Sequence, residues 1–85
     1  MTTEQLNYPL YRKYLNEKSF FKILSPTEFE EIIETGGKYF LNRFTAVILP
    51  DYNLIQDMTL NYEKHWKVIS EREYVEKLML CKKES

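Results

Sequence analysis

Two segments with the same capping pattern constrain the fold more than any other feature of the chain. In Ser25-Pro26-Thr27-Glu28, the serine can cap a first helical turn, the proline needs no donor there, and the glutamate can reach back to the serine amide. Phe29, Ile32 and Ile33 follow with helical spacing, and Gly36-Gly37 favours a left-handed stop. The pattern predicts a helix at about 26–35.

The second capped segment is Ser70-Glu71-Arg72-Glu73, with an apolar stripe behind it that predicts a helix at about 71–80. The two segments align without gaps at an offset of 45 residues, since Lys22-Ile23-Leu24-Ser25 matches Lys67-Val68-Ile69-Ser70. This alignment is compatible with a hairpin-then-helix unit that occurs twice. The alternative is that any strand leading into a capped helix looks like this.

The remaining chain is rich in β-branched and aromatic residues. The predicted strands are 10–15, 19–24, 39–49, 54–60 and 64–69. The segment 54–60 alternates as a strand does, although Ile55, Met58 and Tyr62 also have helical spacing. The prediction is an α+β fold in the order ββα-βββα, with an antiparallel sheet of about five strands and both helices on one face.

The length of 85 residues predicts a single small domain at 1–85, with an ordered core at about 8–80 and flexible ends at 1–6 and 81–85. No apolar run is long enough to span a membrane, and the first residues lack the pattern of a signal peptide, so we expect a cytoplasmic protein. Cys81 is the only cysteine, so the fold has no internal disulfide.

Aromatic residues make up 15% of the chain, whereas Ala46 is its only alanine. Two helices cover only about one face of a five-stranded sheet, so large side chains on the other face would be open to a partner. The residues expected on this interaction face are Tyr11, Arg12, Tyr14, Phe20, Lys22 and Trp66. They predict self-association as a homodimer, or binding to another protein. Alternatively, the tyrosines lie flat against neighbours under lysine and arginine stems.

A single-stranded nucleic-acid binder is the alternative function. Tyr11-Arg12-Lys13-Tyr14 interleaves aromatic and cationic side chains, and Lys18 and Lys22 continue the charge on the paired strand. The net charge of -1 argues against this function, because binding to phosphates usually needs a cationic domain.

Candidate catalytic chemistry is sparse. His65 is the only histidine, and Ser19 and Lys22 lie on an expected strand, where a serine-x-x-lysine site does not form. The sequence therefore predicts no catalytic, cofactor-binding or metal-binding residues, and no cofactor. A carboxylate-based enzyme is the third alternative.

The runs Tyr8-Pro9-Leu10-Tyr11-Arg12-Lys13-Tyr14 and Phe20-Phe21-Lys22-Ile23, followed by the capped segment at Ser25, resemble short uncharacterised proteins of Bacteroidetes-type bacteria. The resemblance extends through Leu49-Pro50-Asp51 to Ile55-Gln56-Asp57-Met58. It implies a bacterial cytosolic origin and supplies no site residues.

Overall fold

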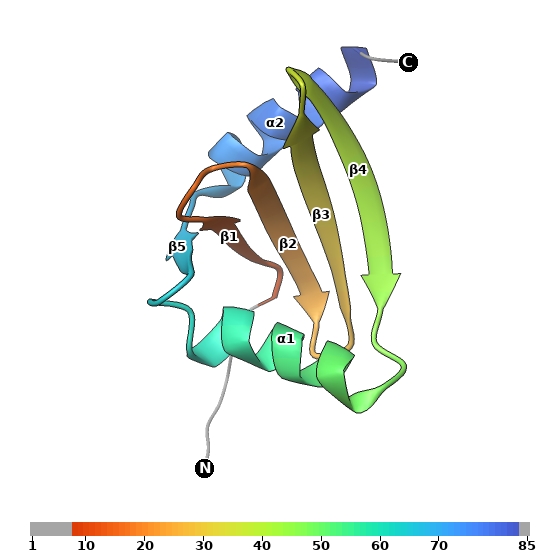
Figure 1. Ribbon diagram of the computed structural model, residues 1–85, viewed down its shortest axis with the longest axis vertical. Helices are drawn as coiled ribbons and strands as arrows, with labels where there is room; N and C mark the ends of the chain where they lie inside the picture. Colours follow the sequence, from red (N-terminus) through yellow and green to blue (C-terminus); the bar gives the residue numbers. More distant parts are fainter. Residues whose placement is uncertain (1–7, 84–85) are drawn as a thin grey trace.

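An antiparallel sheet forms the centre of the computed structural model, which describes residues 8–83, with side chains through residue 81 (Figure 1). The elements, in chain order, are β1 (Leu10–Tyr14), β2 (Ser19–Ser25), β3 (Glu28–Thr35), β4 (Lys38–Thr45), α1 (Leu49–Leu60), β5 (Trp66–Val68) and α2 (Glu71–Lys83). The α+β class, the five antiparallel strands and the two helices are confirmed.

The sheet has the strand order β4-β3-β2-β1-β5, so β2 is central and β4 and β5 are the edges. The first hairpin was predicted correctly. Glu17 has a positive φ of 62° in its turn, and the Lys18 amide donates to the Asn16 side chain at 2.9 Å. The predicted strand 39–49 is confirmed as β4 only through Thr45, because residues 46–48 lie in a loop and α1 begins at Leu49. The strand 64–69 is confirmed as the shorter β5.

The predicted helix at 26–35 is wrong, because residues 28–35 form strand β3. Ser25 does accept a backbone hydrogen bond, but from the Thr27 amide at 3.1 Å, so it organises a turn between β2 and β3. Strand β3 pairs with β2 on one side and with β4 on the other. Both ladders satisfy its backbone groups, and this tertiary pairing overrides a helical pattern that is only a few residues long.

Gly36-Gly37 is a hairpin turn instead of a helix stop. Their φ angles are 60° and 82°, and Thr35 pairs directly with Lys38 across them. Two consecutive residues with positive φ are what a two-residue type I′ turn requires, and this turn follows the twist of the strands that it joins.

The predicted strand at 54–60 is also wrong, because residues 49–60 form helix α1. Pro50 lies in its first turn, and the Asp51 carboxylate accepts from the Val47 amide at 3.1 Å and the Ile48 amide at 3.4 Å. Ile55 and Met58 face the core with helical spacing. Helical spacing puts both side chains on the same side of α1, where they pack in one cluster with Phe21 and Phe29 of the sheet.

Helix α2 confirms the prediction at 71–80 and continues to Lys83. The Glu73 amide donates to the Ser70 hydroxyl at 3.1 Å, as the capping pattern predicts. The predicted internal repeat is absent from the fold, because the 45-residue offset aligns strand β3 with helix α2. The two aligned segments are similar because each contains a turn that follows a strand. The turn at Ser25 leads into strand β3, whereas the turn at Ser70 leads into helix α2.

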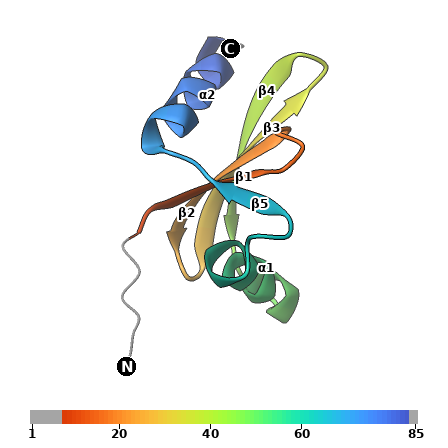
Figure 2. The ribbon, with the colours of Figure 1, turned by 90° about the vertical axis from the view of Figure 1, so that its left-hand side faces the viewer.

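The two helices lie on opposite faces of the sheet, not on one face as predicted (Figure 2). Adjacent residues of a strand point to opposite faces, and both Phe20 and Phe21 in β2 are buried. Phe21 packs in one cluster with Ile55 and Met58 of α1, whereas Phe20 packs in another with Tyr74 of α2. Each face of the central strand therefore has its own core.

The predictions for the chain ends have two outcomes. Residues 81–83 continue α2, so the expected flexible end does not begin at 81. The expected flexibility of 1–6 and of 84–85 lies outside the described residues.

Replacing Met58 by alanine should lower the free energy of unfolding by about 2–4 kcal/mol, because Met58 has no exposed surface and its removal leaves a cavity between α1 and the sheet. Urea denaturation measures the change. Met79→Ala is the matched control, since Met79 is 57% exposed on α2 and its loss should cost less than about 0.5 kcal/mol. Equal losses in the two variants would contradict the burial of α1 against the sheet.

Candidate protein-interaction edge

The six residues of the predicted interaction face do not share one surface. Arg12, Tyr14 and Trp66 lie on the α1 face, and Tyr11, Phe20 and Lys22 lie on the α2 face. Three of them are buried and three are half-buried. Their aromatic rings pack inside the domain, where Tyr14 stacks on Trp66 at 5.5 Å and Tyr11 meets Tyr74 at 5.5 Å. Arg12 and the four aromatic residues therefore hold the sheet and helices together.

Arg12 shows this structural role most clearly. Its Nε donates to the Met58 carbonyl at 2.9 Å, its Nη1 donates to the Tyr11 carbonyl at 2.8 Å, and its guanidinium lies 4.4 Å from the centre of the Tyr62 ring. Burial lowers the pKa of this guanidinium from its ordinary value, which is high enough that the charge remains. Arg12 therefore ties β1 to the end of α1.

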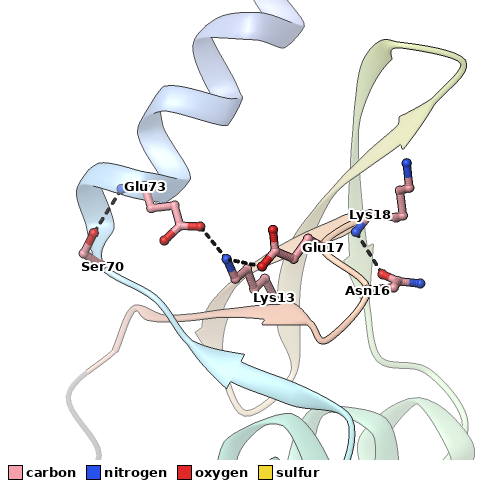
Figure 3. A network of polar contacts seen from close by, with 6 residues as sticks. All are labelled: Lys13, Asn16, Glu17, Lys18, Ser70 and Glu73. Atoms are coloured by element: carbon pink, nitrogen blue, oxygen red, sulfur yellow. Dashed lines mark hydrogen bonds and ion pairs between the residues drawn. The ribbon is translucent and has the colours of Figure 1, made fainter.

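Two cations of the first hairpin, Lys13 and Lys18, are engaged by carboxylates. Lys13 contacts Glu17 at 3.2 Å and Glu73 at 3.0 Å, so it links the hairpin to the start of α2 (Figure 3). Lys18 forms an ion pair with Glu34 at 3.7 Å. With Arg12 buried, the first hairpin does not present the row of unpaired cations beside stacked rings that single-strand recognition uses.

The exposed apolar surface lies on strand β4, at the edge of the sheet. Seven of its eight residues are exposed, and only Tyr39 is half-buried. Phe40, Leu41 and Phe44 are 49%, 45% and 41% exposed. Natural sheets usually protect such an edge with charges, a proline or a bulge, and an unprotected apolar edge is a template for another strand.

On the α1 face, the β4 edge presents two phenylalanines. Phe44 stacks on Phe29 of the neighbouring strand with ring centres 4.9 Å apart, and Phe40 pairs across the ladder with Ile33. Asn42 lies between the two rings on the same face. The stacking holds one ring in place at the edge while leaving part of its surface open.

On the α2 face, the single charged side chain in the middle of β4 is neutralised. Arg43 forms an ion pair with Glu30, a buried carboxylate that also accepts from the Tyr74 hydroxyl at 3.2 Å. Burial and the adjacent Glu30 raise the pKa of Tyr74 well above its usual range, so the hydroxyl remains a donor. The ion pair reduces the net charge at the centre of β4, although the Arg43 side chain stays largely exposed.

An apolar segment continues directly from the C-terminal end of β4. Val47, Ile48 and Leu49 are 76%, 58% and 70% exposed before α1 turns back under the sheet (Figure 1). Together, Phe40, Leu41, Phe44 and the segment 47–49 define what we call the β4 edge patch. Exposed apolar side chains that gather on one edge, here on both faces of the strand, are typical of interaction sites.

Glu31 lies beside this patch, next to a pocket of about 180 Å³ that Phe29, Phe44 and Leu54 also line. Loss of hydration raises its pKa, and a hydrogen bond with Ser19 partly opposes the shift. Among the side chains described, those of residues 8–81, no cation forms an ion pair with Glu31.

The sequence contained a signal for this edge in Gly36-Gly37, because two glycines between β-rich runs are typical of a hairpin. That signal places β3 beside β4. It does not reveal that β4 lacks a further neighbour, since strand order depends on contacts far apart along the chain.

No protein-family model, curated protein or solved structure matches this chain. The resemblance to short bacterial proteins therefore stays a prediction. Across residues 8–83, no helix is both long and apolar enough to cross a membrane. The same residues contain no group of three or more histidine, cysteine, aspartate or glutamate side chains that could hold a metal ion.

Replacing Glu31 by glutamine should raise the free energy of unfolding at pH 7 by up to about 1 kcal/mol, since solvent still screens part of the carboxylate. The ordinary pKa of a glutamate side chain, about 4.3, applies to the unfolded state. Because the pKa of Glu31 is higher in the folded state, the folded protein binds more protons than the unfolded chain as the pH rises above that value. Stability of the native protein therefore falls across that window. Urea denaturation at pH 4 and pH 7 should show the glutamine variant gaining only at the higher pH.

The control for this prediction is Glu63→Gln, because Glu63 is exposed in the loop between α1 and β5. Its stability change should stay within about 0.5 kcal/mol. A pH-independent gain for Glu31→Gln would mean that ionisation is not the cause.

Proposed function

We propose that this protein is a protein-binding module that takes an extended segment onto strand β4. The observation that carries the proposal is that β4 ends the sheet with seven of its eight residues exposed, including Phe40, Leu41 and Phe44. Addition of a strand to an open edge is a recurrent mode of peptide recognition.

The backbone supports this mode because alternate residues of an edge strand aim their amide and carbonyl groups away from the sheet. The Ala46 amide donates to the Thr27 carbonyl at 2.7 Å, so even-numbered residues face β3. Alternation then gives the outward groups to Tyr39, Leu41, Arg43 and Thr45. A partner strand would find regularly spaced donors and acceptors along β4.

Side chains would supply specificity on both sides of this strand. Phe40 and Phe44 offer aromatic surface on the α1 face, whereas Leu41 offers aliphatic surface on the α2 face. A matching segment needs apolar residues at alternate positions for Phe40 and Phe44. Because Glu30 neutralises Arg43, the partner needs no acidic residue at the centre of the edge.

The experiment is a selection of short peptides from a random displayed library on the wild-type protein, followed by affinity measurement on two proline variants. Leu41→Pro removes an outward amide of β4 without removing a hydrogen bond to β3, and should weaken binding by about tenfold or more. Nuclear magnetic resonance titration should place the largest amide shifts on β4.

Val68→Pro is the matched control at the opposite edge. The hydrogen bonds of the Leu15 amide to His65 and of the Ile69 amide to Tyr11 show that odd-numbered residues of β5 face β1. The Val68 amide therefore points outward as well, and its loss should leave peptide affinity unchanged. Equal weakening by the two prolines, selection of no peptide, or shifts confined to the helices would contradict strand addition at β4.

A further inference from the structure

The β4 sequence is complementary to itself, and this identifies an occupant for the edge. We propose that a second copy of this chain pairs its β4 antiparallel to the first, about a two-fold axis at Asn42, so that the two sheets become one. The inference rests on the proposed function, because it uses the same outward backbone groups.

The two-fold symmetry restricts the register. Side chains that oppose each other across such a pair must lie on the same face of the joined sheet, so even-numbered residues meet even-numbered ones. Centring the pair on Asn42 places Phe40 of each copy opposite Phe44 of the other. These are pairs without mutual hydrogen bonds, in which side chains approach most closely. Both exposed rings of each edge are then covered.

The other register with long overlap is centred on Leu41. It places Phe40 opposite Asn42 and Phe44 opposite Lys38, so neither phenylalanine meets another. Aromatic pairs directly across two strands contribute more than an aromatic residue beside a polar one. The exposed rings therefore favour the register centred on Asn42.

Charge also favours a second copy. In this register Lys38 lies opposite Ala46 and Arg43 lies opposite Leu41, so no like charges oppose each other directly. Each Arg43 is already bound to Glu30 of its own chain. The whole chain carries a net charge of -1, which offers little repulsion between copies.

The opposite edge of the sheet does not compete for this strand. Strand β5 has three residues, against eight in β4, so pairing of β4 with β5 of a neighbour would leave most of β4 open. Such head-to-tail contacts would build rings or filaments instead of a closed pair of two copies. Pairing β4 with β4 covers the longer edge and ends with two copies.

The expected dimer is weak. Eight residues at about 3.4 Å each make an edge about 27 Å long, and a contact of one strand's width covers less area than a standard interface. The segment 47–49 adds apolar surface beyond Ala46, beside the hairpin turn of the second copy. Association should therefore be visible across micromolar to millimolar concentrations.

The first measurement is sedimentation of the wild-type chain from about 10 µM to about 1 mM. The average mass should rise from that of one chain toward that of two. Leu41→Lys places a charge on the outward edge and should raise the dissociation constant by about tenfold or more. Val68→Lys, on the β5 edge, is the control and should leave the mass curve unchanged.

The second measurement tests the register by oxidation in a Cys81→Ser background. Asn42→Cys places the two sulfurs across the two-fold axis, where the Cα atoms of such a pair lie about 4.5 Å apart and can be bridged. Leu41→Cys is the matched variant, because its Cα atoms would be more than about 7 Å apart. Covalent dimer should form at least about tenfold faster with Asn42→Cys.

Three results would overturn the inference: a single-chain mass at every concentration, a mass curve unaffected by Leu41→Lys, or faster cross-linking through Leu41→Cys. The peptide titrations separate this failure from that of the proposed function. If the wild type stays a monomer but binds peptide through β4, strand addition holds and the second copy is not its partner. If the wild type neither dimerises nor binds peptide, β4 is not an interaction site at all.

Discussion

The structure depends on the central strand β2, which places large apolar side chains on both faces. Phe20 and Phe21 are adjacent and each is 2% exposed, so neither face of the sheet can be left to solvent. One helix per face meets this requirement, with α1 against the cluster around Phe21 and α2 against the cluster around Phe20. The aromatic excess of the sequence is used mainly to fill these two cores.

This arrangement has a consequence for the edges of the sheet. Each face has one helix, and although α2 also lies against β4, the rings of Phe40 and Phe44 on the α1 face remain exposed. The buried Glu30 holds Arg43 on the outermost strand, which ties β4 to β3 and partly offsets the charge that would otherwise protect this edge. The interaction that fastens β4 to the domain thus also makes its outer side suitable for another strand.

Local sequence patterns predicted the structure correctly where each pattern is typical of only one kind of structure. Ser70 caps α2 as expected, and Asn16-Glu17-Lys18 forms the first hairpin turn. Ser25 and Gly36-Gly37 were ambiguous, because a serine before proline and a glycine pair serve turns as well as helix ends. The segment 54–60 was ambiguous as well. Ile55 and Met58 have the spacing of a helix, but apolar residues also alternate as in a strand up to Leu60. The predicted interaction residues were large and aromatic, but Arg12, Phe20 and Trp66 are buried.

The sequence by itself determined the α+β class, the first hairpin and the capped helix at the C-terminal end, because these follow from composition and short-range hydrogen bonds. The numbers of strands and helices agree with the prediction only because the wrong helix at 26–35 and the wrong strand at 54–60 cancel each other. Tertiary structure alone decided that residues 28–35 are a strand, that the helices take opposite faces, and that β4 is an open edge. Each of these depends on which strand lies beside which. That order is set by backbone pairing and burial between residues distant along the chain, which local patterns do not specify.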